Sequence, residues 1–378
     1  MKNHRSAGKF GLCAALGLIW PTASQAQINI TAADMFNQPG QYYRAYSNAT
    51  NNTNVSVSGM LGNAGGPQLW DFTSGPGDVI YRFDYLAATN APHGADFVTA
   101  GAKVAEQKTD ESGAVSQAWL YFAQDAARGR LVYGFYDPDF SASIGGNQAQ
   151  EDFSSALNDF PATIRYGDAW SSSTTFTNTI TFGDPNDPLG GSFSVDLLIA
   201  YSATDVVDAY GVANSPAIGF GDCLRVNELV TYDTSADFND GTGFQHLETD
   251  YVRNYLWLRP GRGIVAQVTS QQSSGTPPDE NFLTASAVMR MFETNHPDPG
   301  GPGTGGGIQG LRLTLGPSGA LLQWTALPSV TSYRVEYTTN PGAGWQPVGN
   351  TTTANYLVDA AAGKPNTPMR FYRVVGLP

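Results

Sequence analysis

Alternation of apolar and polar residues with a period of two is the dominant pattern along the middle of this chain. The run 79–85, VIYRFDY, places an apolar residue at every second position. This alternation predicts strands, because successive side chains of a strand point to opposite faces of a sheet. Similar runs, rich in aromatic and β-branched residues and bounded by Gly, Pro or Asp, predict further strands. The predicted strands are 79–85, 117–122, 130–136, 170–182, 192–201, 205–210, 218–230, 250–258, 264–270 and 282–292.

A few short features interrupt this pattern. Thr31 precedes a short apolar stretch and Asp34 follows three residues later, which predicts one capped helical turn. Residues 55–57 predict an early edge strand, and 259–263, RPGRG, predict a hairpin turn between two strands. The segment 150–160 has helical character.

These elements together predict an all-β fold. The helical segments are too few and too short to cover a sheet, so the sheets must cover each other. We therefore expect a large antiparallel domain that is β-sandwich-like or open and barrel-like. No internal repeat of the propeller or solenoid type is visible in the sequence.

A stretch of Gly and Pro divides the chain. Residues 297–307 read PDPGGPGTGGG and offer no side chain that could bury apolar surface. Such a stretch is typical of an extended linker between units that fold separately. The predicted organisation is a first domain over 27–295, a linker over 296–307 and a second domain over 308–378.

The second predicted domain carries its own strand pattern. Its strands are expected at 311–315, 320–324, 332–337, 345–348, 355–358 and 369–375. The motifs are Leu-Gln-Trp at 322–324, YRVEY at 333–337 followed by an Asn-Pro turn and Trp345, and RFYRV at 370–374.

On these motifs, residues 308–378 resemble a fibronectin type III-like module of secreted bacterial proteins. The resemblance implies a small β-sandwich that contributes spacing, stability or adhesion. A length of about seventy residues is short for seven strands, so one strand is expected to be missing or reduced to a loop. The expected core is Trp324, Tyr333, Val335, Tyr337, Trp345, Phe371 and Val374. In the first domain, Leu69–Phe72 and the hairpin 255–266 faintly resemble secreted bacterial β domains of unassigned role.

The start of the chain predicts export. Lys2, Arg5 and Lys9 precede an apolar run over 10–20, and Ser24-Gln25-Ala26 supplies small residues at the cleavage positions. Residues 1–26 are therefore predicted to be a signal peptide cleaved near Ala26, and the mature protein is expected to be secreted, either extracellular or periplasmic. The apolar run is too short to span a bilayer, and no later stretch carries eighteen consecutive apolar residues, so no transmembrane segment is expected.

Composition narrows the classes of function. The chain has 33 Asp and Glu against 20 Lys and Arg, for a formal charge of −13, which argues against nucleic acid as a partner. Cys223 is expected to act as a small buried hydrophobe. Neither G-x-S-x-G nor H-E-x-x-H occurs, and no Gly-rich loop leads into a helix. A monomer is expected.

One cluster of candidate ligands lies on a predicted strand. His246, Glu248 and Asp250 are spaced by two, which would put an imidazole and two carboxylates on one face of the strand. Such a row could hold a divalent cation. The alternative is a solvated face that pairs with Arg253 or Arg262 across the hairpin.

A second candidate lies in the preceding turn. Asp237, Asn239 and Asp240 make it rich in oxygen atoms, as in a calcium loop, although the regular spacing and the closing Glu of such loops are missing. The alternative is a turn whose residues serve backbone geometry. Calcium is thus a possible ligand, and no other cofactor is predicted.

The functional hypothesis rests on aromatic residues and on the missing catalytic motifs. Trp70, Trp119, Trp170 and Trp257 are expected to be mostly core, but an exposed pair of rings could stack on sugars. We therefore expect a non-catalytic extracellular binding or adhesion protein for carbohydrate or another surface polymer. The alternatives are a carbohydrate-active hydrolase with two strand-borne carboxylates, which leave no sequence mark, and a structural envelope component.

Overall fold

The computed structural model describes most of the chain outside its first residues and several loops. The described residues are 28–111, 118–138, 149–182, 193–296, 311–316, 319–324, 331–340, 344–362, 364 and 368–377. The predicted signal peptide, 1–26, and residues 297–307 of the predicted linker lie outside them.

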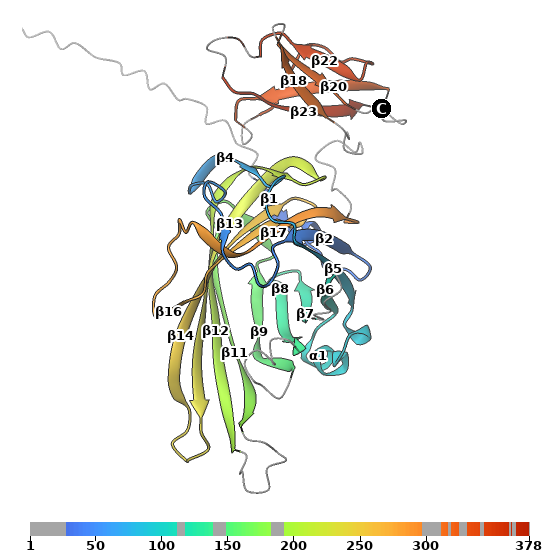
Figure 1. Ribbon diagram of the computed structural model, residues 1–378. Coiled ribbons are helices and arrows are strands. Elements are labelled where there is room, and N and C mark those ends of the chain that lie inside the picture. Colours follow the sequence, from blue (N-terminus) through green and yellow to red (C-terminus); the bar gives the residue numbers. More distant parts are fainter. Residues whose placement is uncertain are drawn as a thin grey trace, which may run out of the picture.

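Fifteen of the described strands form one large sheet. Its hydrogen-bonded order is β11-β12-β13-β14-β15-β17-β2-β5-β6-β7-β8-β9, and β16, β3 and β4 join it at the side of β14, β17 and β12 (Figure 1). All pairings are antiparallel except that of β4 with β12. The strands are β2 (Tyr42–Ser47), β3 (Val55–Ser56), β4 (Gly65–Asp71), β5 (Val79–Ala87), β6 (Val104–Asp110), β7 (Ala118–Asp125), β8 (Gly129–Tyr136), β9 (Gln150–Phe160), β11 (Ala169–Phe182), β12 (Phe193–Ser215), β13 (Gly219–Asp237), β14 (Gln245–Arg259), β15 (Gly263–Ser270), β16 (Ser273–Ser274) and β17 (Thr284–Thr294).

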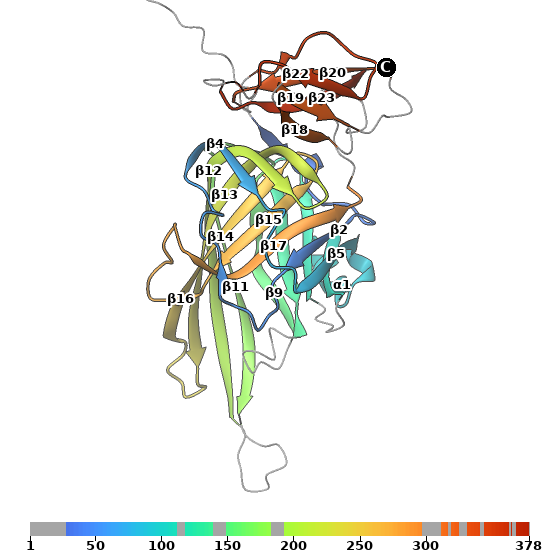
Figure 2. The same cartoon turned by 45° about the horizontal axis from the view of Figure 1, so that its top comes forward.

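The sheet curls until its two end strands, β9 and β11, lie side by side (Figures 1 and 2). Side chains join the two strands. The Thr174 hydroxyl donates to the Ser155 carbonyl at 2.9 Å, and the Thr175 backbone N–H donates to the Ser154 hydroxyl at 3.1 Å. The curled sheet therefore encloses an interior whose faces belong to strands far apart in sequence.

The first described residues cover one end of this interior. Strand β1 (Asn29–Thr31) pairs with β10 (Thr163–Arg165), and the 3-10 turn η1 (Ala32–Asp34) follows. The Asp34 carboxylate accepts hydrogen bonds from the backbone N–H of Thr31 and of Gly261, both at 2.8 Å. This confirms the predicted capped turn, and the predicted hairpin turn between β14 and β15 is also present.

A short helical insertion covers part of the outside. The 3-10 turn η2 (Ala88–Asn90) and helix α1 (Gly94–Ala100) connect β5 to β6. The helix is anchored by Phe97, whose ring stacks on that of Tyr121 with the centroids 3.8 Å apart.

The main core lies between the two halves of the curled sheet. It contains buried residues from β5 and β6 as well as from β12 to β15. Trp257 is fully buried and meets Phe72 edge to face at 4.8 Å. The curled form is compatible with both predicted architectures, since the halves of the sheet face each other as in a sandwich and the end strands meet.

The all-β class is therefore confirmed, but two details of the predicted pattern differ. Residues 150–160 form strand β9 instead of a helix, because pairing with β8 and burial of Leu157 and Phe160 outweigh local helical propensity. The predicted strands 192–201 and 205–210 are one continuous strand, β12, because the intervening residues stay paired with β13.

Residues 311–377 include two small antiparallel sheets. Their orders are β18-β19-β22 and β21-β20-β23. The strands are β18 (Arg312–Gly316), β19 (Gly319–Gln323), β20 (Ser332–Thr338), β21 (Gln346–Pro347), β22 (Tyr356–Asp359) and β23 (Phe371–Leu377).

The core between these two sheets matches the expected list only in part. Trp324, Tyr333 and Val335 are buried and Val374 packs against them, as predicted. Tyr337, Trp345 and Phe371 lie outside this core. The ring of Tyr337 supports Arg370 at 3.9 Å and that of Trp345 supports Arg373 at 4.6 Å, so these two rings act as platforms for cations. The fibronectin type III-like assignment stays a prediction.

Within the described ranges, no helix has both the length and the apolar character needed to cross a membrane.

Replacement of Gly129 tests the packing of β8 against the end of β9. Gly129 has a φ of +100°, and a Cβ there would collide with the Phe160 carbonyl oxygen. Gly129→Ala should lower the free energy of unfolding by about 1 to 3 kcal/mol from crowding, in addition to about 1 to 2 kcal/mol from the backbone conformation. Gly167→Ala is the matched control, because its φ is +88° and the space around it is open. Urea unfolding of both variants measures the difference, and equal losses would contradict the close approach.

Candidate functional site

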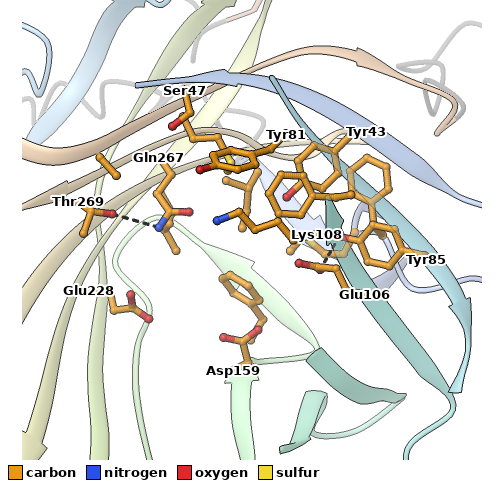
Figure 3. Close-up of a pocket in the computed structure, with 18 of the residues that line it drawn as sticks. Tyr43, Ser47, Tyr81, Tyr85, Glu106, Lys108, Asp159, Glu228, Gln267 and Thr269 are labelled. Atoms are coloured by element: carbon orange, nitrogen blue, oxygen red, sulfur yellow. Dashed lines mark hydrogen bonds between the residues drawn. The ribbon is translucent and has the colours of Figure 1, made fainter. Parts of the chain in front are cut away.

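The interior of the curled sheet contains a cavity of about 500 Å³ (Figure 3). This volume lies within the usual range of small-molecule sites, about 300 to 1,000 Å³. The lining is mixed, with aromatic rings, ionisable groups and neutral hydrogen-bonding side chains. It includes Phe36, Tyr43, Ser47, Tyr81, Phe83, Tyr85, Glu106, Lys108, Arg130, Asp159, Phe160, Glu228, Gln267 and Thr269.

One wall of the cavity is made of aromatic rings from β2 and β5. Tyr43 and Phe83 are opposite each other in the pairing of these strands, and their rings stack with the centroids 4.3 Å apart. Phe36, from the segment that covers the end of the sheet, stacks on Tyr85 at 5.3 Å. Burial raises the pKa of both Tyr43 and Tyr85 well above the ordinary value, so their hydroxyl groups stay protonated. This wall offers flat apolar faces together with hydroxyl groups.

Arg130 holds two carboxylates at the side of this wall. It is 7 % exposed, and its guanidinium lies 3.3 Å from Glu106 and 3.3 Å from Asp159. Glu106 also accepts a hydrogen bond from the Tyr85 hydroxyl at 2.7 Å. Burial alone would lower the pKa of Arg130, but the two carboxylates raise it overall, so Arg130 keeps its charge.

Lys108 brings a second cation into the cavity. Its amine lies 4.1 Å from the centre of the Tyr81 ring, and in Figure 3 the side chain ends near the middle of the cavity. Burial lowers the pKa of this amine. The lysine can donate hydrogen bonds to a ligand that enters the cavity.

The opposite side carries a pair of carboxyl groups. Asp205 on β12 lies directly across from Glu228 on β13, and Glu228 lies across from Asn254 on β14. Residues paired in this way share one face of the sheet, with their Cβ atoms about 4.5 to 5.5 Å apart. Asn254 donates to Glu228 at 2.5 Å. Glu228 lines the cavity, and Asp205, at 2 % exposure, lies beside it.

This carboxyl pair does not ionise like exposed acids. Burial raises the pKa of Asp205, and Glu228 and Asp159 raise it further. Burial likewise raises the pKa of Glu228, against the hydrogen bond from Asn254, and Asp159 adds to the rise. Two adjacent carboxyl groups away from water cannot both ionise without a cation beside them, so the pair retains a proton near neutral pH.

Neutral hydrogen-bonding groups complete the lining. Gln267 on β15 donates to the hydroxyl of Thr269 at 3.3 Å, and Ser47 on β2 lies on the same side as Tyr81 in Figure 3. Amide and hydroxyl groups of this kind can both donate and accept. The cavity can therefore bind a compact polar molecule that has at least one apolar face.

The residues predicted as metal ligands lie elsewhere. His246 is exposed on β14 and its Nδ1 lies 3.2 Å from Asp233. Glu248 is also exposed, whereas Asp250 is buried and accepts hydrogen bonds from Ser274 and Gln272. A register shift in the pairing of β13 with β14 falls beside His246 and breaks the expected regular row.

Neither expected arginine partner faces that row. Arg253 donates to Asn227 and to the Pro278 carbonyl, and Arg262 donates to the His296 carbonyl.

The oxygen-rich turn at 237–243 is held by its own hydrogen bonds. Asp237 accepts from the Asn239 backbone N–H at 2.8 Å, and Asp240 accepts from the backbone and the hydroxyl of Thr242 at 2.9 and 2.6 Å. Asn239 has a φ of +57° and donates to the Ser194 carbonyl at 3.0 Å. In the part of the chain that the structure describes, no group of three or more His, Cys, Asp and Glu side chains is arranged to hold a metal ion. The calcium hypothesis stays a prediction.

Three of the four tryptophans weighed as sugar-stacking candidates are core residues, and so is the cysteine, as expected. Trp70, Trp119 and Trp257 are buried, and Trp170 is half-buried with its indole N–H donating to the Asp159 carbonyl at 3.1 Å. Cys223 is fully buried, which raises the pKa of its thiol. The rings that line the cavity are instead tyrosines and phenylalanines.

The ionisable residues at the cavity were not predicted from the sequence. The sequence pattern does mark two acids there, Glu228 and its neighbour Asp205. In β12 the inward positions are Val195, Leu197, Ile199, Tyr201, Ala203, Asp205 and Val207. Asp205 is therefore a carboxylate in a row of inward-facing positions that are otherwise apolar. On β13, Glu228 has the same kind of position, between Val226 and Val230. A polar residue at an inward-facing position breaks the alternation of apolar and polar residues along a strand. Such breaks are typical of functional positions.

Comparison with known proteins finds no matching family model, no matching curated protein and no matching solved structure.

The carboxyl pair predicts how stability depends on pH. The folded chain holds protons on Asp205 and Glu228 that the unfolded chain loses above about pH 4. Stability should therefore fall as the pH rises from about 5 to about 9, because the unfolded state binds fewer protons in that range. Asp205→Asn should make this fall shallower. Glu248→Gln, an exposed acid on β14, is the control and should keep the slope of the wild type.

Urea unfolding at a series of pH values measures these slopes. An unchanged slope in Asp205→Asn would show that the carboxyl pair does not retain a proton in the folded protein.

Proposed function

We propose that this chain is an exported, non-catalytic binding protein whose ligand is a carbohydrate, held in the cavity inside the curled sheet. The observation that carries the proposal is the composition of the cavity wall. Stacked rings of Tyr43 and Phe83 face the same space as the hydrogen-bonding groups of Gln267, Thr269 and Ser47. Sugars combine an apolar ring face with a rim of hydroxyl groups, so they need both kinds of wall.

The sequence adds two supports to this proposal. The predicted signal peptide would carry the protein out of the cytoplasm. Polysaccharides and other surface polymers are found outside the cytoplasm, so an exported protein could reach them. The predicted fibronectin type III-like module would space the binding domain from a surface or attach it there. The cavity favours this role over that of a structural envelope component, which has no need of a polar interior space.

One observation favours a second candidate, a carbohydrate-active hydrolase. Asp159 on β9 and Glu228 on β13 both line the cavity, and burial raises the pKa of each. A carboxyl group that keeps its proton near neutral pH can act as a general acid, and a second carboxylate can act as nucleophile or base. Reducing ends released from the bound glycans would identify the hydrolase, and their loss in Glu228→Gln would assign the acid.

A glycan screen of the mature chain tests the binding function. Residues 27–378 should bind at least one member of a panel of soluble oligosaccharides, with or without calcium. Gln267→Leu removes hydrogen-bonding groups from the cavity at similar side-chain volume, and we expect about a fivefold weaker affinity from the loss of one hydrogen bond. Gln323→Leu, at an exposed glutamine of β19, is the matched control and should bind as the wild type does.

Calorimetry on the sugar that binds best measures the two affinities. Failure of every sugar to bind, or equal loss in both variants, would contradict a carbohydrate site in this cavity.

A further inference from the structure

The charges inside the cavity are distributed unevenly. Arg130 lies within ion-pair distance of both Glu106 and Asp159 on one side. Glu228 on the other side has a hydrogen bond from the uncharged Asn254. Among the described residues, no hydrogen bond or ion pair holds the carboxyl group of Asp205, although this residue is 98 % buried.

On the strands around Asp205 and Glu228, no described basic side chain forms an ion pair with either acid. No Lys or Arg occurs between Arg165 and Arg225, so β11 and β12 carry none. Arg225, on β13, forms an ion pair with Asp208 at 2.7 Å. On β14, Arg253 donates to Asn227. The nearest basic groups are therefore already engaged by other partners.

The other groups that act on the pair are acids and phenols. Asp159 reaches it from β9, and Tyr201 on β12 and Tyr232 on β13 lie four positions along the same strands. Trp170 on β11 lies across from Asp205 and contributes no charge. The charged groups that act on Lys108 are a different set, Asp137, Glu106 and Asp110. The cavity thus has an acidic side at Glu228, with Asp205 beside it, and neither acid is among the charged groups that act on Lys108.

We propose that the ligand of this cavity is a sugar with a free primary ammonium group, and that Glu228, which lines the cavity beside Asp205, accepts a hydrogen bond from that group. This inference rests on the carbohydrate-binding function proposed above. An ammonium carries three N–H donors and one positive charge. Glu228 offers its free oxygen as an acceptor in the cavity, Asp205 lies directly beside it in the sheet, and no described basic group forms an ion pair with either acid.

The rest of the cavity suits the remainder of such a ligand. The aromatic wall that includes Tyr43 and Phe83 can contact the apolar part of the sugar, and Gln267 can bond its hydroxyl groups. Lys108 can donate to a ring or hydroxyl oxygen of the same sugar. The site therefore distinguishes an amino sugar from its neutral relatives by charge and not by shape.

Binding of an ammonium is coupled to the loss of a proton. The pair retains a proton because two negative charges would repel each other in the absence of a cation. A bound ammonium supplies that cation, so the retained proton leaves when the ligand binds. The affinity for an amino sugar should therefore rise between about pH 5 and about pH 7, where the sugar's own amine stays protonated, while the affinity for a neutral sugar should change little.

Matched sugars test the proposal on residues 27–378. Calorimetry compares glucose, N-acetylglucosamine and glucosamine, and the corresponding triplets of galacto and manno configuration. We expect the amine of at least one triplet to bind about tenfold or more tightly than its two neutral relatives, since a charge-assisted hydrogen bond is lost in both. Titrations in two buffers of different ionisation enthalpy should also show release of protons with the amine alone.

Variants of the pair locate the effect. Asp205→Asn and Glu228→Gln keep the side-chain shape, and each should reduce the preference for the amine about tenfold while leaving weak binding of the neutral sugars. Glu248→Gln is the control, and circular dichroism checks that every variant is folded.

Each result separates this inference from the function on which it rests. Equal affinity for amine and neutral sugars, or a preference that survives in both variants, would overturn the inference and leave carbohydrate binding in place. No binding by any of the sugars would overturn both.

Discussion

The contact between the end strands β9 and β11 is the constraint on which the interior depends. An end strand has unpaired backbone groups, and here side chains satisfy some of them. The Thr174 hydroxyl bonds to the carbonyl of Ser155, and the Trp170 indole bonds to the carbonyl of Asp159. Trp170 lies across from Asp205 in the sheet. Closure of the sheet thus brings Asp159, from the last strand of its order, to the two acids near the first.

Closure also decides which charges must be balanced inside the protein. Arg130 is almost fully buried, and its desolvation is offset by Glu106, by Asp159 and by the face of the Phe122 ring, 4.2 Å from the guanidinium. Asp205 and Glu228 have no comparable partner and retain a proton instead. On one side of the interior a buried cation lies between two acids, and on the other side a retained proton is what limits the repulsion between two acids.

The sequence predicts most of this fold but little of the site. Runs such as 79–85 and 264–270 have a period of two and bounding turns, so they identify β5 and β15, and the capping pair Thr31 and Asp34 identifies the first turn. Residues 150–160 were wrongly expected to be helical, because their strand form depends on β8, a partner that local sequence does not show. The cavity brings together Lys108, Asp159 and Glu228, whose spacing in sequence carries no mark of their proximity. At the inward-facing positions of β12 and β13, the sequence shows that Asp205 and Glu228 interrupt apolar residues, but it does not show which other residues lie near them.

That broken pattern favours a role in binding over a role in packing. Apolar residues at 205 and 228 would fill the interior without the cost of burying two adjacent acids, and buried ionisable groups are often no better for stability than apolar residues of similar size. Glu228 instead lines an open space of about 500 Å³, which rings and hydrogen-bonding groups also line, and Asp205 lies beside Glu228 in the sheet. Acids with shifted pKa values in a cavity of this kind are typical of functional sites, where residues are selected for binding or catalysis and not for close packing. The proposed ligand with a positive charge would account for the acids, the rings and the space together, because its ammonium would take the place of the retained proton and the rest of it would fill the volume.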